Sequence, residues 1–343
     1  MIATVSTIKE VAKKAGVSIS VVSKTFNNYS DVREETRQKI FAVAKELNYT
    51  PNIVAKNLSS KKQMTFGLIS SGVLNNNEKD HNAFDIFKGV YTALSDSQYE
   101  LSIYLIDSQK QKHQSYVQYC RERNIGGAIL QGIRTDDQYY RELIDTNIPC
   151  VVLDIMTESA NGLIGSVSID NVKAAYEVAA YLLECGHRCI TIVAGTKETF
   201  VNSERLRGIR QAFKQHGLEL TEEQILYADF SEEEAYGKAK VYLTEEQPTA
   251  FLCLSDLMAF GVMKAIKEAG LMIPGDISVT GFDGLVVGNY TQPALTTIHQ
   301  DFIEIGRLSA LLLQDLKEQK TGPQQIFAKH QLIQRASVKI LDH

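Results

Sequence analysis

One stretch near the start of the chain, residues 7–28, restricts the possible folds more than any other. Its apolar residues recur at the spacing of one helical face: Ile8, Val11, Ala12 and Ala15. Gly16 then interrupts this spacing, and Ser18 suits the N-cap of a second helix with Val22 and Phe26 on its inner face. Two short helices around a tight turn predict a helix-turn-helix, which places its second helix in the major groove of DNA.

The same pattern also fits an ordinary helical hairpin with a solvated lysine face. The next segment, Arg33–Leu47, can cover the hairpin with one apolar face formed by Ile40, Val43, Ala44 and Leu47. Asp31 and Glu34, three residues apart, predict a capping box at the start of this third helix.

The charge distribution favours a module that contacts phosphate. Residues 1–63 carry a net charge of +6 and the remaining residues carry −11, which together give the −5 of the whole chain. A basic N-terminal segment followed by an acidic remainder of the chain is typical of nucleic-acid-binding proteins. A basic surface lobe without a partner is the alternative.

Composition argues against several other classes of protein. No run approaches the roughly 18 apolar residues of a membrane span, and we expect no signal peptide and no membrane partner. The five dispersed cysteines suit reduced thiols in the cytoplasm. We expect no metal site, because Cys185-Gly-His187-Arg-Cys189 lacks a second pair of ligands. No G-x-S-x-G, H-E-x-x-H or Walker A motif is present, so we expect no cofactor, no catalytic residues and no enzyme activity.

Five sequence blocks in a fixed order carry a resemblance to a known family. Between residues 7 and 58 they read T-I-K-E-V-A-K-K-A-G-V-S, V-S-K, E-E-T-R, L-N-Y-T-P-N and A-K-N-L. These blocks resemble the DNA-binding headpiece of the lactose-repressor/galactose-repressor family of bacterial transcription regulators. The resemblance continues at lower density through most of the remaining chain.

The second helix should present its early, outward side chains to base edges. Residues that match Ile19, Ser20 and Lys24 are the base readers of the family. Ile19 can touch a thymine methyl group, Ser20 can bond either kind of base, and Lys24 can reach guanine O6 and N7. Most relatives carry arginine at the position of Lys24, and lysine lacks the two-pronged guanidinium. Phosphate contacts that fix the register are expected from Ser18, Ser23 and Asn27.

Residues 51–58 are a candidate hinge helix. Pro51 suits the first turn, and Asn52, Ala55 and Leu58 would share one face. Eight residues cannot hold a helix in water alone, so this segment should order only when two copies meet on DNA. The resemblance implies that Leu58 is inserted into the minor groove. The alternative is an ordinary apolar residue in a linker that ends with the polar residues 59–63.

From Thr65 the pattern alternates strands and helices, which predicts parallel sheets with helices on both faces. The expected strands are Phe66–Ser71, Leu101–Asp107, Gly127–Leu130, Pro149–Leu153, Cys189–Val193, Ile225–Ala228, Ala250–Leu254 and Ile277–Phe282. The expected helices are Phe84–Asp96, Ser115–Asn124, Asp137–Thr146, Asn171–Cys185, Glu204–Gln215, Glu232–Thr244, Leu257–Ala269 and Asp301–Leu316.

The resemblance implies a periplasmic-binding-protein-like core of two doubly wound parallel-sheet lobes behind the all-α headpiece. The blocks G-F-D at 281–283 and P-A-L-T-T-I-H-Q at 293–300 match family signatures. We expect three crossings between the lobes, near Gly165–Asn171, Tyr290–Thr297 and Phe327–Gln331. The expected domains are the headpiece 1–50, the hinge and linker 51–63, a first lobe of 64–165 and 298–326, and a second lobe of 166–297 and 327–343.

Ligands of open parallel sheets bind at the carboxyl ends of the strands. Polar residues that follow the expected strands, or lie near the second crossing, are therefore candidate effector contacts: His81, Asn82, Asp85, Asp154, Arg205, Ser255, Asp283 and Gln300. Arg205 also matches the R-x-x-G arginine of the family. Asp256 is interpreted instead as a helix cap. Carboxylates, amides and one arginine suit a polyhydroxylated ligand such as a sugar or a nucleoside, because each hydroxyl both donates and accepts.

We therefore expect a sequence-specific, cytoplasmic DNA-binding regulator of carbohydrate-related genes, most often a repressor by resemblance. A homodimer should bind a near-palindromic operator, and a small effector should favour one arrangement of the lobes. No leucine-heptad tail precedes His343, which favours a dimer over a tetramer. Two alternatives stay open: a cytoplasmic sugar- or nucleoside-binding protein without DNA activity, and a regulator controlled by a protein co-regulator.

Overall fold

The computed structural model describes residues 6–26, 29–50, 64–71, 82–106, 115–134, 137–143, 146–157, 162–197, 199–320 and 324–341. The chain forms two compact units, residues 1–63 and residues 64–343. Within the described residues, no helix is both long enough and apolar enough to cross a membrane.

The first unit contains the predicted helix-turn-helix and its third helix: α1 (Ile8–Ala15), α2 (Ile19–Phe26) and α3 (Glu34–Glu46). Thr7 and Glu10 form a capping box at the start of α1, and Gly16 ends the helix with a φ of 69°, a conformation that favours glycine. The Ser18 hydroxyl accepts a hydrogen bond from the Val21 N–H, as predicted for an N-cap. The small core is formed by Val11, Ala12, Ala15, Val22, Ile40 and Ala44.

The predicted capping box of Asp31 and Glu34 is wrong. Arg33 is the N-cap of α3 and its side chain makes no capping bond. Asp31 therefore lies two residues before the cap, beyond reach of the first free N–H groups of the helix. The Asp31 carboxylate forms an ion pair with Lys24 instead.

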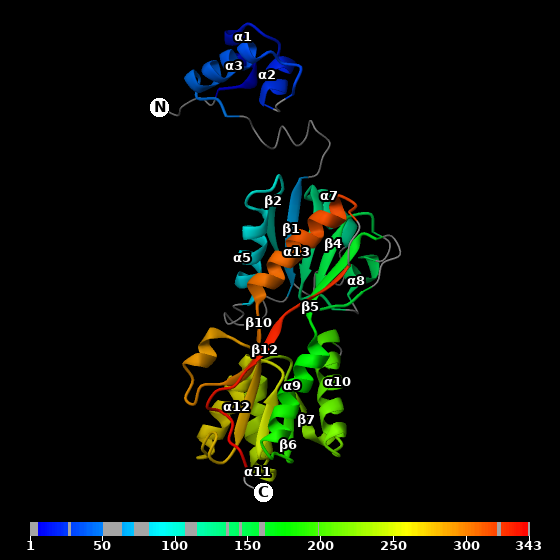
Figure 1. The fold of residues 1–343 in the computed structure, drawn as a ribbon, viewed down its shortest axis with the longest axis vertical. Coiled ribbons are helices and arrows are strands. Elements are labelled where there is room, and N and C mark those ends of the chain that lie inside the picture. Colours follow the sequence, from blue (N-terminus) through cyan, green and yellow to red (C-terminus); the bar gives the residue numbers. More distant parts are fainter. Residues whose placement is uncertain are drawn as a thin grey trace. The chain divides into compact units, whose positions relative to one another are not determined.

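The first sheet of the second unit is parallel throughout and follows the order β11-β5-β4-β3-β1-β2. Its strands are β1 (Thr65–Ser71), β2 (Glu100–Ile106), β3 (Ile125–Gln131), β4 (Cys150–Leu153), β5 (Ile164–Ile169) and β11 (Gln325–Ala328). The helices that belong with it are α5 (Asn82–Leu94), α7 (Tyr116–Glu122), α8 (Gln138–Leu143) and α13 (Phe302–Lys317). Figure 1 shows this sheet with α13 in orange and α5 in cyan.

The second sheet follows the order β12-β10-β9-β8-β6-β7. Only β12 among these described strands is antiparallel to its neighbour, β10. Its strands are β6 (Ile190–Ala194), β7 (Ile225–Tyr227), β8 (Ala250–Cys253), β9 (Ser278–Asp283), β10 (Thr296–Gln300) and β12 (His330–Ile333). The accompanying helices are α9 (Asn171–Glu184), α10 (Phe200–Gln215), α11 (Glu232–Glu245) and α12 (Asp256–Glu268), with two 3-10 turns, η1 (Glu222–Gln224) and η2 (Val286–Asn289).

The chain passes between the two sheets at Asp170, Asp301 and Lys329. The first and third positions lie within the predicted crossings. The second crossing was expected near Tyr290–Thr297, but β10 pairs with both β9 and β12 and so belongs wholly to the second sheet. The passage to the first sheet follows β10, because β10 is paired with β9 as far as His299 and with β12 as far as Gln300.

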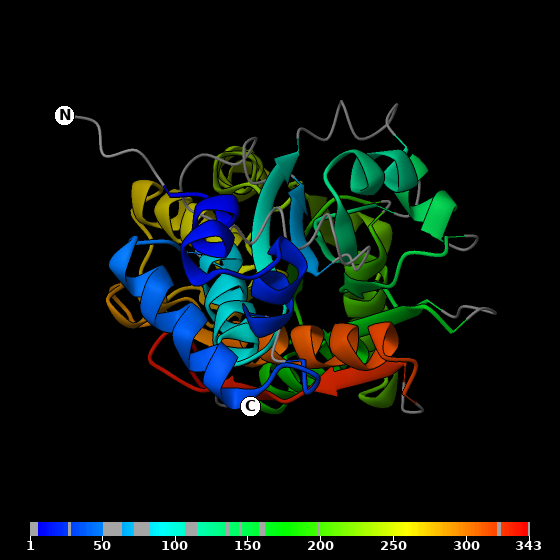
Figure 2. The same cartoon turned by 90° about the horizontal axis from the view of Figure 1, so that it is seen from above.

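Helices α5 and α13 pack at backbone distance, and two glycines make this possible. A Cβ atom on Gly89 of α5 would lie 1.9 Å from the Ile303 carbonyl oxygen of α13, and one on Gly306 would lie 2.2 Å from the Ile86 carbonyl oxygen. Figures 1 and 2 both show the two helices in contact. Any side chain at these positions would therefore separate the helices.

We expect Gly89→Ala to lower the free energy of unfolding of the core by about 2 kcal/mol, because the added methyl group overlaps a fixed carbonyl. The control is Gly237→Ala in α11, where a Cβ meets nothing within 4 Å. That change should stabilise the protein by roughly 0.5–1 kcal/mol, because alanine is the better helix former. Urea unfolding followed by circular dichroism measures both, and equal effects would contradict the packing argument.

Asp256 holds the carboxyl end of the second sheet together. Its side chain is fully buried, and its two carboxylate oxygens accept hydrogen bonds of 2.6 Å from the Thr297 hydroxyl and the Leu285 N–H. It does not cap α12 as predicted, because Ser255 is the N-cap. Burial raises the pKa of Asp256 to about 7, although these hydrogen bonds oppose the shift.

This raised pKa gives stability a pH dependence of known sign. Between pH 4 and pH 7 the folded protein holds a proton on Asp256 that the unfolded chain releases, so stability falls as the pH rises through this window. In Asp256→Asn the amide can accept from Leu285 and donate to Thr297, whose hydroxyl has the Ile298 carbonyl 3.3 Å away. Between pH 5 and pH 8, we expect the free energy of unfolding of the variant to fall by about 2 kcal/mol less than that of the parent. Urea unfolding at each pH tests this, and parallel pH profiles would refute it.

Candidate functional site

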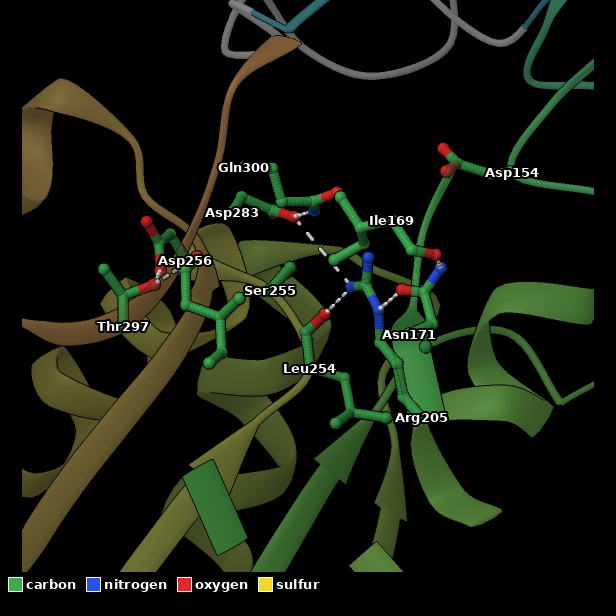
Figure 3. A network of polar contacts seen from close by, with 12 residues as sticks. Asp154, Ile169, Asn171, Arg205, Leu254, Ser255, Asp256, Asp283, Thr297 and Gln300 are labelled. Atoms are coloured by element: carbon green, nitrogen blue, oxygen red, sulfur yellow. Dashed lines mark hydrogen bonds and ion pairs between the residues drawn. The ribbon is translucent and has the colours of Figure 1, made fainter. Parts of the chain in front are cut away.

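A buried arginine lies at the centre of a polar network at the carboxyl ends of the strands. Arg205 of α10 is 4% exposed. Its Nε donates to the Asn171 side-chain oxygen at 2.9 Å, and its Nη1 donates to the Leu254 carbonyl at 2.6 Å. The guanidinium lies 3.7 Å above the ring of Phe282. Figure 3 shows the Arg205 side chain rising between Asn171 and Leu254 toward Asp283.

Asp283 supplies a carboxylate for this guanidinium. Its Oδ1 lies 3.9 Å from Arg205 Nη1 and accepts a 2.8 Å hydrogen bond from the Gln300 amide. Asp283 has a φ of 123°, in the region that L-residues rarely adopt. Such strain persists only where the surroundings determine the conformation, and it is common at ligand-binding positions.

The network extends from the second sheet to the end of the first. The Asn171 amide donates to the Ser168 hydroxyl at 3.1 Å, and that hydroxyl donates to Asp154 Oδ1 at 2.8 Å. Ser168 is in β5 and Asp154 follows β4, whereas Asn171 opens α9. A continuous chain of polar contacts therefore joins residues from both lobes of the core.

Burial shifts the titration of the charged members of the network. Burial lowers the pKa of Arg205, while Asp283, Asp154 and Asp256 oppose this shift. Burial raises the pKa of Asp154, against the hydrogen bond from Ser168 and the charge of Arg205. Arginine cannot lose its proton in proteins, so one fixed cation faces several carboxylates.

One acceptor in this network is left without a donor. In the described part of the chain, the Gln300 side-chain oxygen is buried and has no hydrogen-bond partner, because the amide nitrogen is the atom that bonds Asp283. A buried, unsatisfied carbonyl oxygen is costly and calls for a partner. A hydroxyl or amine of a ligand would supply that missing donor.

A cavity of about 790 Å³ adjoins the network, which is within the range of small-molecule sites. It shares Ser168 and Asn171 with the network, and also Ile169, whose carbonyl accepts a hydrogen bond of 3.4 Å from the Asn171 amide. Its other lining residues are aromatic, apolar, charged or, in the case of Gln211, neutral and polar: Met156, Asp170, Val172, Lys173, Tyr176, Phe200, Glu204, Arg207, Gln211 and Phe327. Apolar faces beside hydrogen-bonding groups suit the two faces of a sugar ring.

The structure brings four of the predicted effector contacts together: Asp154, Arg205, Asp283 and Gln300. Ser255 is 4% exposed and its hydroxyl accepts from the Met258 N–H as the cap of α12. Asn82 and Asp85 lie in the first turn of α5, and their described contacts do not include the network. His81 lies outside the described residues.

Asn171 and Ser168, which connect Arg205 to Asp154, were not among the effector contacts predicted from the sequence. Residues 165–171 were expected to form a crossing and not the end of a strand. The useful signal was the Asp170-Asn171 pair that precedes a helical pattern, since such a pair at a strand end places polar side chains at the sheet edge.

The headpiece presents the start of α2 at its surface. Ser18, Ile19 and Ser20 are exposed, and Ser23 and Lys24 are half-buried one turn later. This is the arrangement that reading a major groove requires. The other predicted DNA contacts, Asn27, Asn52, Ala55 and Leu58, lie outside the described residues.

Comparisons with known proteins agree with this architecture. Residues 7–52 match the model of bacterial regulatory proteins of the lacI family, and residues 179–338 match the periplasmic binding protein-like domain. The HTH-type transcriptional repressors PurR of Proteus mirabilis (strain HI4320) and Yersinia pestis (strain Pestoides F) are 32% and 33% identical over 337 residues, 97% of each chain.

Solved structures extend the likeness to three dimensions. A structure of the Lac repressor dimer bound to operator and an anti-inducer superposes with a TM-score of 0.84 at 26% identity, over 98% of this chain and 100% of that one. A complex of the regulator CelR with cellobiose gives a TM-score of 0.73 at 25% identity, over 97% and 99%. The predicted fold class is confirmed. The chain belongs to the lacI family of bacterial regulatory proteins and is a DNA-binding transcription regulator.

Proposed function

We propose that this regulator is a cytoplasmic repressor of carbohydrate-related genes that binds operator DNA as a homodimer and is controlled by a neutral polyhydroxylated effector. The observation that carries the proposal is the Arg205 network, which connects polar residues of both lobes. The Lac repressor relative is a dimer on its operator, and the CelR relative holds cellobiose. Both support the proposed partners.

The charges of the network indicate the chemical class of the effector. Asp154 and Asp283 offer carboxylate oxygens, and Gln300 adds a buried oxygen without a donor among the described residues. Arg205 is the cation of the network itself, and Lys173 and Arg207 line the adjoining cavity. A ligand with several hydroxyl donors fits this arrangement, whereas a phosphate group would meet two carboxylates. A sugar is favoured over a sugar phosphate, and a nucleoside has the same donors on its ribose.

The effector would act by favouring one arrangement of the two lobes. A ligand that hydrogen-bonds Gln300 and Asp154 together contacts the second sheet and the first sheet at once. Its affinity therefore depends on the distance between these sheet ends, and only such differential affinity shifts a conformational equilibrium. A change in the first lobe would then be transmitted to the segment that joins it to the headpiece.

On the DNA side we propose the roles expected from the exposed face of α2. Ile19, Ser20 and Lys24 read base edges, and Ser18, Ser23 and Asn27 bind phosphates. Asn52, Ala55 and Leu58 form the hinge helix, with Leu58 inserted in the minor groove. In the core, we propose Asp154, Arg205, Asp283 and Gln300 as the main effector contacts, and His81, Asn82, Asp85 and Ser255 as further candidates.

The effector class can be tested with the purified protein and its own promoter fragment. We expect gel retardation of the fragment to change with a neutral mono- or disaccharide or a nucleoside, and to be unaffected by the matching sugar phosphates at the same concentrations. A response to sugar phosphates alone would overturn the charge argument. Failure to retard the fragment under any ligand condition at low salt would overturn the proposed repressor function.

Arg205→Ala should weaken the effector response by about 10- to 100-fold in ligand concentration, because charged hydrogen bonds to the ligand and its neighbours are lost. Operator binding without effector should stay within about threefold of the parent. The matched control is Arg210→Ala on the same helix, whose exposed guanidinium pairs with Glu222 and should not affect the response. Thermal unfolding checks that the Arg205 variant is folded, and an unchanged effector midpoint in that variant would contradict the assignment.

A further inference from the structure

Lys24, which the proposed function places among the base readers of α2, is paired with a carboxylate within the headpiece. The Lys24 ammonium donates a hydrogen bond to the Asp31 carboxylate, and the two side chains are 43% and 54% exposed. Lys24 lies four residues after Ser20 and therefore on the same face of α2. Any contact that Lys24 makes to DNA must compete with Asp31.

Asp31 lies in the connection between α2 and α3, which is tied to α3 on both sides of the α2 end. Arg37 of α3 donates to the Tyr29 carbonyl at 2.8 Å and to the Thr25 carbonyl at 3.3 Å. These bonds hold the backbone on both sides of the α2 end. The hydrogen bond from Lys24 lowers the pKa of Asp31, so its carboxylate is ionised at neutral pH.

The competition between Asp31 and DNA for the Lys24 ammonium should depend on the base that faces Lys24. An exposed ion pair contributes little, so a better set of acceptors can displace it. Guanine offers O6 and N7 to Lys24 in the major groove, whereas an A·T pair offers fewer acceptors beside a donor or a methyl group. Away from guanine the ammonium stays with Asp31, and the negative carboxylate remains near the phosphates and repels them.

We propose that Asp31 is a positioning residue for DNA recognition that retains Lys24 unless guanine is present, and so raises the ratio of specific to non-specific binding. This inference rests on the proposed function, and specifically on Lys24 as a base reader. Asp31 itself need not contact DNA. Its effect comes from occupying the ammonium and from adding one negative charge at the DNA-facing surface.

The headpiece contains a matched control for this ion pair. Lys14 of α1 pairs with Glu46 of α3 at 2.6 Å, and both side chains are exposed. Glu46→Gln removes the same charge and the same kind of ion pair, but it frees a lysine that the sequence does not place among the base readers. Any change in DNA affinity in Asp31→Asn beyond that in Glu46→Gln is therefore due to the position of the Lys24–Asp31 ion pair at α2.

The experiment compares the full-length parent with Asp31→Asn, Glu46→Gln, Lys24→Ala and the double variant Lys24→Ala/Asp31→Asn. Fluorescence anisotropy measures binding to the duplex that the parent selects from randomised DNA, and to an alternating A·T duplex that contains no guanine. We expect Asp31→Asn to tighten binding to the A·T duplex by about threefold and to change binding to the selected duplex less. The slope of log affinity against log salt on the A·T duplex should steepen by about 0.9, because Lys24 now neutralises a phosphate.

The double variant distinguishes an effect of Asp31 that acts through Lys24 from one that is independent of Lys24. If Asp31 acts through Lys24, then Asp31→Asn should leave the ratio of specific to non-specific affinity unchanged in the Lys24→Ala background. Equal effects of Asp31→Asn and Glu46→Gln in the parent would refute the role of Asp31. An unchanged base preference of Lys24→Ala in the randomised selection would instead refute the reader role of Lys24. Thermal unfolding confirms that each exposed substitution leaves the headpiece folded.

Discussion

The buried guanidinium of Arg205 is the constraint on which the architecture of the site depends. A group that cannot lose its charge must find acceptors when it is removed from water. These acceptors come from the start of α9, from the residue after β8 and from the end of β9. The ends of three separate elements are therefore fixed around one side chain, and Phe282 supplies an aromatic face below it. Movement of any of these ends would remove one acceptor from a buried charge.

The same requirement connects the two lobes. Asn171 uses its oxygen for Arg205 and its nitrogen for Ser168, and Ser168 in turn donates to Asp154. Because both polar atoms of the Asn171 amide are bonded, a displacement of Arg205 or of Ser168 would also move the other. The segment between Ser168 and Asn171 is also the first crossing of the chain, so the polar contacts and the covalent connection meet at one place. A ligand that alters this group of contacts acts where the lobes are joined.

Much of the fold was predictable from the sequence, because most strands of the two parallel sheets are short apolar runs between helical patterns. Four strands were missed, namely β5, β10, β11 and β12, and the first two differ in composition from the predicted strands. β5 contains the buried residues Ser166 and Ser168, and β10 contains the buried residues Thr296 and Thr297. Serine and threonine are common in loops, so a sequence pattern does not identify those whose hydroxyls are hydrogen-bonded inside a strand. The network was predicted only in part for a related reason. Arg205 lies in a recognisable helical pattern and Asp283 ends a recognisable strand. Asn171, in contrast, joins Ser168, three residues away, to Arg205, 34 residues away, and no local pattern predicts the second contact.

Two carboxylates with basic partners show why residue type alone does not determine a role. Asp283 is nearly buried beside Arg205 and is held further by Gln300, so separating the two charges would leave each of them buried with fewer partners. Asp31 and Lys24 have the same chemistry at the surface, where water can replace either partner at little cost. The buried pair is suited to fix a geometry, and the exposed pair is suited to exchange. The proposed effector site would use the first property and the proposed DNA-reading surface would use the second.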